Sequence, residues 1–184
     1  MIKIFSTALV ILMLAGAAFS QGKSSEAILK QLKTLKADKT FGLNYDKGSD
    51  VSKIYGFGEN FAEASRYKLE YFRFGLAFFF PGKTLASAPD AYVLTFQAGG
   101  KKPLFAASHA LKFTIDKENL DIGEARYVGK DIEYLNFKLT RGQLSKIAKG
   151  KIVRVKIGDA EFALTPEHIK MFANLLALSD PSAL

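Results

Sequence analysis

The chain has 184 residues, a formal net charge of +8 at pH 7 and no cysteine. The lack of cysteine excludes a disulfide framework, a cysteine nucleophile and thiolate metal sites. A basic balance favours anionic partners such as phosphates, acidic lipids or acidic glycans, although exported proteins without such partners are often basic too.

The first twenty residues have the pattern of a secretory signal peptide. Lys3 precedes an apolar run, residues 4–19, and small residues lie near its end, where cleavage would occur. The run is interrupted by hydroxyl residues and is shorter than the roughly 20 residues that a membrane span needs, which favours cleavage over an uncleaved anchor. We predict a signal peptide over 1–20, cut near 20–22, and one exported domain over 21–184, secreted or periplasmic and without a transmembrane segment once the signal is removed.

Residues 25–37 are the first predicted element of the exported part. Ile28, Leu32 and Leu35 recur at helical spacing, and lysines occupy the opposite side. We predict a short amphipathic helix that packs on the domain with its lysines in water, in preference to a basic helix on a membrane surface.

Between residues 41 and 139 the hydrophobic pattern changes to a period of two, which is typical of half-buried strands. The alternation is clearest over 91–97, 110–116 and 133–139. The helices that a parallel α/β fold needs between successive strands are missing from the pattern.

The stretch YKLEYFRFGLAFFFPGK, residues 67–83, is rich in tyrosine and phenylalanine. Its charges argue against a membrane helix, and we predict a long strand, bent near Gly75 and ended by Pro81 and Gly82. One face of this strand is apolar and belongs in the core. The other face is mixed, and the sequence leaves open whether protein covers it or a ligand does. The apolar face carries Phe72, Phe74, Leu76, Phe78 and Phe80, and the mixed face carries Tyr71, Arg73, Gly75, Ala77 and Phe79.

The C-terminal part begins with a capping box, in which Thr140 and Gln143 can exchange hydrogen bonds at the start of a helix over 141–148. Gly158 and Asp159 then form a two-residue hairpin turn. That turn sets a register in which apolar residues meet apolar residues and lysine meets glutamate. The predicted pairs are Ile157 with Ala160, Lys156 with Glu161, Val155 with Phe162, and Val153 with Leu164.

A last helix follows, with Thr165 as its N-cap and Pro166 at its first position. Its predicted buried stripe is Ile169, Phe172, Leu175 and Leu176. These elements predict an α+β fold, a mainly antiparallel twisted sheet or partial β-sandwich, with an N-terminal helix and a C-terminal helix–hairpin–helix module.

Catalytic and metal-binding patterns are scarce. His109 and His168 have no spacing that brings them together on a metal, so we predict no metal site and no cofactor. Gly56 and Gly58 lack the third glycine and the lysine of nucleotide-binding loops, and are interpreted as a turn between strands. A carboxylate-based hydrolase needs two paired acids, and no spacing singles out a pair. The candidate acids are Glu59, Glu63, Glu70, Asp90, Glu124, Asp131 and Glu133.

One cluster of charge exceeds the background. Six basic residues and no acidic one lie between residues 141 and 158, and on both the helix and the hairpin they fall opposite apolar positions. They can be an ordinary solvated face or a docking surface for an anionic envelope component, either lipid phosphate or a glycan. Nucleic acid is disfavoured because the interleaved residues are aliphatic rather than aromatic. The candidate site residues are Arg141, Lys146, Lys149, Lys151, Arg154 and Lys156.

The leading functional hypothesis is an exported, non-catalytic domain with a binding or scaffolding role in the cell envelope. A carrier of an apolar or lipid ligand in a β-rich cavity is the first alternative, suggested by the 16 phenylalanines. A hydrolase that uses carboxylates is the second. The sequence leaves the oligomeric state open.

Overall fold

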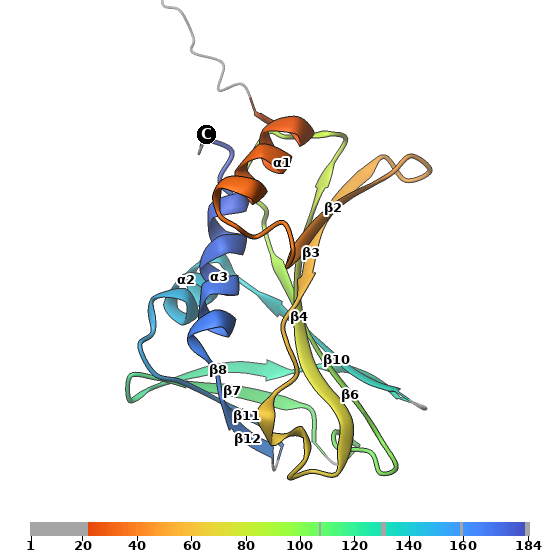
Figure 1. Ribbon diagram of the computed structural model, residues 1–184, viewed down its shortest axis with the longest axis vertical. Helices are drawn as coiled ribbons and strands as arrows, with labels where there is room; N and C mark the ends of the chain where they lie inside the picture. The colour runs from red at the N-terminus through yellow and green to blue at the C-terminus, as the bar shows by residue number, and fades with distance from the viewer. Residues whose placement is uncertain (1–21, 107, 130–131, 159, 183–184) are drawn as a thin grey trace, which may run out of the picture.

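The computed structural model describes residues 22–106, 108–129, 132–158 and 160–182. The predicted signal peptide therefore lies outside the described residues. The fold is α+β with twisted antiparallel sheets, as the sequence predicts. In Figure 1 the helices and a four-stranded sheet lie on one side of a six-stranded sheet, and the other side of that sheet is uncovered.

The sheets are built from strands that are mostly short. The six-stranded sheet has the order β2 (Phe41–Asp46), β3 (Val51–Phe57), β4 (Leu69–Pro81), β6 (Tyr92–Gly100), β10 (Ile132–Leu139) and β9 (Arg126–Gly129). The four-stranded sheet has the order β12 (Ala160–Ala163), β11 (Val153–Ile157), β7 (Ala110–Ile115) and β8 (Glu118–Glu124). β1 (Lys23–Ser24) pairs with β5 (Thr84–Leu85) in a separate ribbon.

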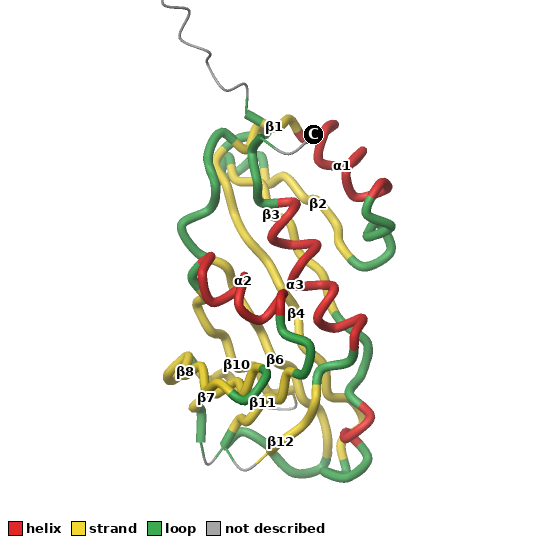
Figure 2. The backbone as a smooth tube through the Cα atoms, turned by 90° about the vertical axis from the view of Figure 1, so that its left-hand side faces the viewer, coloured by secondary structure: helices red, strands yellow, loops and turns green. Residues whose placement is uncertain are grey.

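Three α-helices and one 3₁₀ turn complete the described chain. They are α1 (Ser25–Thr34), η1 (Ala62–Ala64), α2 (Arg141–Lys149) and α3 (Pro166–Leu178). Seen from the helical side, α2 and α3 lie in front of the strands of the large sheet (Figure 2).

Phenylalanine rings fill the space between the large sheet and the layer of helices and small sheet. Phe61, just after β3, lies 4.3 Å from Phe162 of β12 between ring centroids, and Phe74 of β4 stacks on Phe172 of α3 at 5.4 Å. Aromatic pairs at such distances contribute about 0.5–1.5 kcal/mol each beyond the burial of their area. This aromatic core joins the two larger sheets through side-chain packing.

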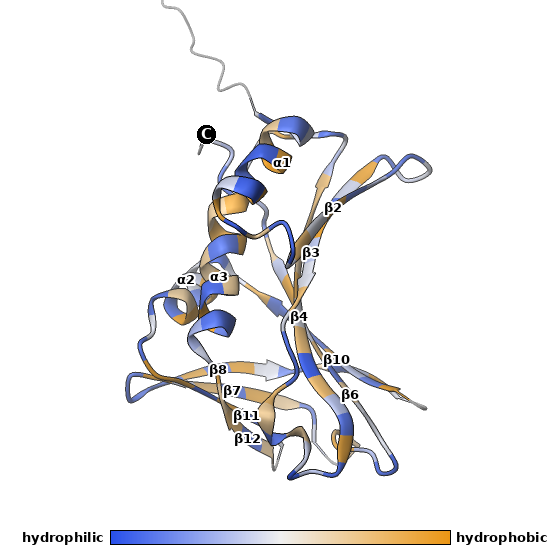
Figure 3. Ribbon diagram, in the orientation of Figure 1, coloured by the Kyte–Doolittle hydropathy of each residue, from blue (hydrophilic) through white to orange (hydrophobic). Residues whose placement is uncertain are grey.

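Strand β4 is the long strand predicted for the aromatic stretch. The alternation of hydrophobic and hydrophilic residues along it can be followed in Figure 3. Its apolar face is buried in the core, whereas its mixed face lies on the uncovered side of the large sheet. The irregularity in its pairing lies between Leu69 and Tyr71, rather than near Gly75 as predicted.

The C-terminal part has the predicted caps and register. Thr140 and Gln143 form both hydrogen bonds of the capping box of α2. Ile157 pairs with Ala160 and Val155 with Phe162, although Asp159 of the predicted turn lies outside the described residues. In α3 the buried residues are His168, Met171, Phe172, Leu175 and Leu178, while the predicted Ile169 and Leu176 are only half-buried.

Two local predictions were wrong, one helix boundary and one turn. The first helix ends at Thr34 rather than near Ala37, because Lys36 adopts a left-handed conformation (φ 53°) and the amide of Ala37 donates to the carbonyl of Leu32 (2.8 Å). This is the Schellman arrangement that ends helices. Gly56 is not in a turn but inside β3, where a Cβ atom would lie 2.5 Å from the carbonyl oxygen of Thr40.

Candidate functional site

The six predicted basic residues lie on two elements and on the connection between them. Arg141, Lys146 and Lys149 lie on α2, Lys151 lies in the connection to β11, and Arg154 and Lys156 lie on β11. The structure distributes them over three surroundings.

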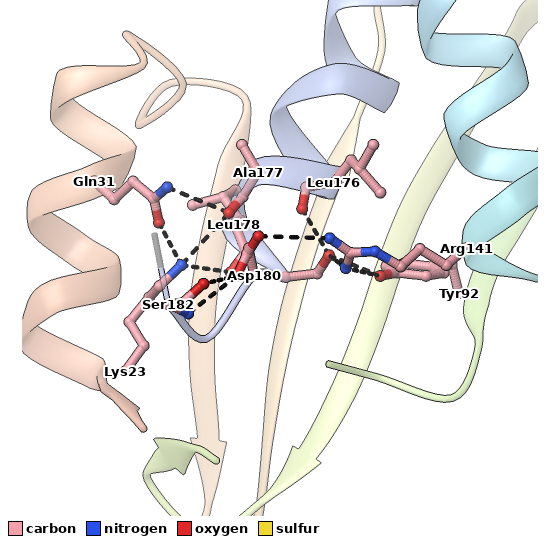
Figure 4. Close-up of polar contacts among 10 residues, drawn as sticks. Lys23, Gln31, Tyr92, Arg141, Leu176, Ala177, Leu178, Asp180 and Ser182 are labelled. Atoms are coloured by element: carbon pink, nitrogen blue, oxygen red, sulfur yellow. Dashed lines mark hydrogen bonds and ion pairs between the residues drawn. The ribbon is translucent and has the colours of Figure 1, made fainter. Parts of the chain in front are cut away.

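Arg141 belongs to a polar cluster at the C-terminal end of α3 (Figure 4). Its guanidinium donates hydrogen bonds to the hydroxyls of Tyr92 (3.3 Å) and Ser179 (3.2 Å), and lies 3.7 Å from the carboxylate of Asp180. Hydrogen bonds from Ser182, aided by the nearby charge of Arg141, hold the pKa of Asp180 below its ordinary value. Arg141 is therefore engaged in fixing the end of a helix.

Lys23 is the second cation of this cluster, and sequence reasoning missed it. Its side chain is buried (2% exposed), and the amine donates to the side chain of Gln31 (2.8 Å) and to the carbonyl of Leu178 (3.2 Å). Burial lowers the pKa of Lys23, and the charge of Asp180 opposes that effect. Because the last carbonyls of a helix lack partners within the helix, a cation here satisfies them and offsets the helix dipole.

The second group of these basic residues lies around Asp116, in the turn between β7 and β8. Its carboxylate accepts hydrogen bonds from the backbone amides of Ile152 (2.8 Å) and Lys151 (3.1 Å), and these bonds lower the pKa of Asp116. The acid thus ties the β7–β8 turn to the connection between α2 and β11. The two segments meet at the left-hand edge of the molecule in Figure 1.

A depression of about 460 Å³ lies beside this tie. Three cations line it. One of them, Lys117, lies far along the chain from the basic residues that the sequence predicted as a site. We call this site the basic depression. Its lining consists of Thr114, Asp116, Lys117, Lys151, Ile152 and Arg154.

Lys146 and Lys149 line a smaller hollow of about 290 Å³ on the other side of Asp116, together with Glu118. Lys156 does not line either hollow; it lies two residues beyond Arg154 on the same exposed face of β11, paired across the strands with Lys112 and Glu161. Of the six predicted residues, Lys151 and Arg154 thus line the basic depression, Lys146 and Lys149 flank it, and Arg141 and Lys156 line neither hollow.

Two exposed ion pairs lie on the small sheet. Arg154 is 3.8 Å from Glu161, and Lys112 is 3.3 Å from Asp121. Exposed pairs contribute only about 0–1 kcal/mol, so Arg154 can turn from Glu161 to another anion at little cost.

The two histidines occupy separate structural positions. His168 is buried in the first turn of α3, where its Nδ1 accepts a hydrogen bond from the amide of Thr165 (3.3 Å). His109 is half-buried and stacks on Tyr127 with ring centroids 4.7 Å apart. Its Nε2 is buried and has no hydrogen-bond partner among the described residues. In the same residues there is no group of three or more metal-ligating side chains.

Only one of the candidate acids in the described part of the chain is buried. Glu133 is buried, but its carboxylate accepts hydrogen bonds from the amides of Leu104 and Phe105 and from the hydroxyl of Tyr127. It therefore holds the loop that follows β6. Glu59, Glu70, Asp90 and Glu124 are exposed, Glu63 is half-buried, and Asp131 lies outside the described residues.

Comparisons with models of known protein families, with curated proteins and with solved structures found no match for this chain. Within the described residues, no helix is long and apolar enough to cross a membrane.

Proposed function

We propose that the protein is an exported, non-catalytic domain that docks on anionic lipid headgroups of the cell envelope through the basic depression. The observation that carries this proposal is the convergence of Lys117, Lys151 and Arg154 from two separate segments around one hollow. The site differs from the cluster predicted along the sequence, since its lining includes Lys117 and does not include Arg141, Lys146, Lys149 or Lys156.

The electrostatics of the basic depression favour a bound anion. Asp116 is its acidic residue, and that carboxylate is already occupied by the amides of Lys151 and Ile152. Lys146 and Lys149 add positive charge on the far side of Asp116. Lysine and arginine side chains bind phosphate oxygens through charge-assisted hydrogen bonds, and each one near an anionic membrane contributes about 1 kcal/mol.

The exposure of Ile152 favours a lipid surface as the source of the phosphate. This side chain is 65% exposed, and it lines the basic depression between the cations. An exposed aliphatic side chain costs little in water but gains from contact with the acyl boundary when its neighbours bind headgroups. An acidic glycan would use the cations without using Ile152.

The two alternatives have weaker support. A carrier needs interior space, whereas phenylalanine rings occupy the interior between the layers. A carboxylate hydrolase needs two convergent acids, whereas the buried Glu133 is committed to backbone amides.

The test is sedimentation of residues 21–184 with vesicles of phosphatidylglycerol and phosphatidylcholine, or of phosphatidylcholine alone, at low and moderate salt. We expect binding to the anionic vesicles only, weakened by salt. Lys151→Ala with Arg154→Ala should weaken it roughly thirtyfold, since two contacts of about 1 kcal/mol are lost.

The matched control is Lys112→Ala with Lys156→Ala, which removes the same formal charge from the same sheet outside the basic depression. Equal loss of binding in the two double variants would show that total charge, and not this site, is responsible. Ile152→Ser should weaken binding to vesicles, and an unchanged affinity in that variant would contradict the lipid assignment.

A further inference from the structure

The uncovered side of the six-stranded sheet carries most of the exposed large hydrophobic side chains. We call it the outer face. Among the described residues, the exposed large hydrophobic side chains are Leu29, Tyr55, Phe57, Phe79, Val128, Ile132 and Ile152. All of these except Leu29 and Ile152 lie on strands β3, β4, β9 and β10 of this sheet.

The strand register places these side chains on one surface. Residues paired directly across antiparallel strands point to the same face. One row crosses five strands through Phe57, Gly75, Thr95, Asn136 and Arg126. Neighbouring rows contain Arg73, Gln97, Tyr134 and Val128 on one side, and Tyr55, Ala77, Val93 and Lys138 on the other. Five strands span about 19 Å, so the outer face is long enough for an extended polymer.

Two aromatic rings are held flat by glycines opposite them. A Cβ atom on Gly75 would lie 2.7 Å from the ring of Phe57, and one on Gly99 would lie 2.4 Å from the ring of Tyr71. These contacts mean that each ring lies over the backbone of the next strand. A ring fixed in this way loses little conformational entropy when a ligand packs on it.

Cations are placed among these rings. The guanidinium of Arg73 lies 4.7 Å from the ring centroid of Phe57, and the amine of Lys53 lies 4.9 Å from that of Tyr55 and 5.5 Å from that of Phe79. The Nε of Arg73 also donates to the side chain of Gln97 (3.0 Å). The ring faces therefore hold both cations in place, and the side-chain amide of Gln97 also holds Arg73.

The acidic residues of this region lie at its margins. Asp46 is at the end of β2, Glu70 is at the irregular start of β4, and Asp90 precedes β6. The interior rows carry Lys53, Arg73, Arg126 and Lys138 instead. One corner is hollowed to about 380 Å³, and its lining includes Asp90 at the margin together with Phe79, Val93, Asn136 and Lys138.

We propose that the outer face binds an extended acidic polysaccharide, whose carboxylates pair with Lys53, Arg73 and Lys138. As Lys53 and Arg73 turn from the ring faces to these carboxylates, sugar rings pack on Tyr55, Phe57 and Phe79 in their place. The electron-rich faces of aromatic rings attract the C–H groups on the flat side of a sugar ring as they attract cations. Arginine and lysine bind carboxylates, and the adjacent amides and hydroxyls suit the sugar hydroxyls.

A lipid surface and single-stranded nucleic acid could also contact both rings and cations, but the structure favours the acidic polysaccharide. A lipid surface requires apolar side chains that project into it, whereas the rings of Phe57 and Tyr71 lie flat against glycines. Single-stranded nucleic acid would also use rings and cations, but the predicted export brings the protein to glycans. Both become comparisons in the experiment.

The experiment measures binding of residues 21–184 to polygalacturonate by calorimetry. Its methyl-esterified form is the comparison, because that form has the same sugar chain without the charge. We expect binding to polygalacturonate and a loss of about tenfold or more on esterification. Tyr55→Ala with Phe79→Ala should weaken binding by a similar factor, since exposed aromatic anchors dominate such surfaces. Both side chains are well exposed, at 37% and 48%, so the fold should tolerate their removal.

Leu29→Ala is the control, because it removes an exposed apolar side chain outside both the outer face and the basic depression. An equal loss in this control, equal affinity for the esterified polymer, or tighter binding of oligothymidylate would overturn the proposal. This surface is separate from the basic depression. The double variant Lys151→Ala, Arg154→Ala should bind polygalacturonate normally, and Tyr55→Ala with Phe79→Ala should bind vesicles normally, so that either proposal can fail alone.

Discussion

His168 caps helix α3 and is also buried among phenylalanine rings. Its Nδ1 accepts from the amide of Thr165, and its ring centroid lies 4.9 Å from that of Phe61 and 5.2 Å from that of Phe74. In α2 the same third position is taken by Gln143. The sequence predicts Thr165 as a cap and the box at Thr140, because glutamine is the usual reciprocal partner. Histidine is not, so the second box could not be anticipated.

Protonation of His168 should destabilise the protein. Burial lowers the pKa of His168 below its ordinary value of 6.5, although the backbone and charge of Glu59 oppose this effect. The unfolded chain therefore binds more protons than the folded one as the pH falls below 6.5. The stability that depends on the neutral ring is fully present above pH 6.5. It is lost as the pH falls from 6.5 towards the pKa of His168 in the folded protein.

His168→Gln should keep the capping box, because glutamine fills this position in α2, and should remove the proton linkage. We expect the urea-unfolding free energy of the variant to change less between pH 7 and pH 5 than that of the native protein. The loss of ring contacts should lower the unfolding free energy of the variant at both pH values. An unaltered pH dependence in the variant would assign the linkage to other groups.

At the scale of elements, β1 and α1 are fastened to the end of α3 through Lys23. The amine reaches the carbonyls of Ala177 (3.4 Å) and Leu178 (3.2 Å), 154 and 155 residues further along the chain. The side-chain amide of Gln31 on α1 donates a hydrogen bond to the same carbonyl of Ala177 (3.3 Å). Amphipathic spacing predicts α1, but nothing in the sequence marks Lys23 among the other lysines near it. A contact over such a separation depends on the completed fold.

Lys23→Ala should destabilise the protein by about 2 kcal/mol, because it removes charge-assisted hydrogen bonds from buried carbonyls at a helix end. Urea unfolding at pH 7 measures this loss. Lys33→Ala is the control, since Lys33 lies exposed on α1. Equal stability of the two variants would mean that solvent replaces Lys23 at the end of α3.

At the scale of the molecule, the period-two pattern predicts which strand faces are buried but not which strands are neighbours. Local turns fix the β11–β12 hairpin, and its predicted register was right. In contrast β7 pairs with β11, some forty residues later, and not with the preceding β6. The division into two sheets, the uncovered outer face and the approach of Lys117 to Lys151 all depend on that distant pairing. For this reason the sequence indicates an α+β fold and a basic C-terminal region, but not the site.

The basic depression and the outer face lie on different sides of the molecule, which gives a last prediction. In Figure 1 the β7–β8 turn and the α2–β11 connection form the left edge, whereas the outer face of the large sheet points to the right. A protein with both binding surfaces can hold a polysaccharide and a membrane at once, which is the scaffolding role considered from the sequence. The effective concentration of the second partner rises once the first is bound.

We therefore expect labelled polygalacturonate to sediment with anionic vesicles only when the protein is present. Either double variant, Lys151→Ala with Arg154→Ala or Tyr55→Ala with Phe79→Ala, should abolish this co-sedimentation while leaving one kind of binding intact. Mixing the two variants should not restore it, because each molecule then carries only one working surface. Restoration by the mixture would indicate that association between copies, rather than two surfaces on one chain, links the partners.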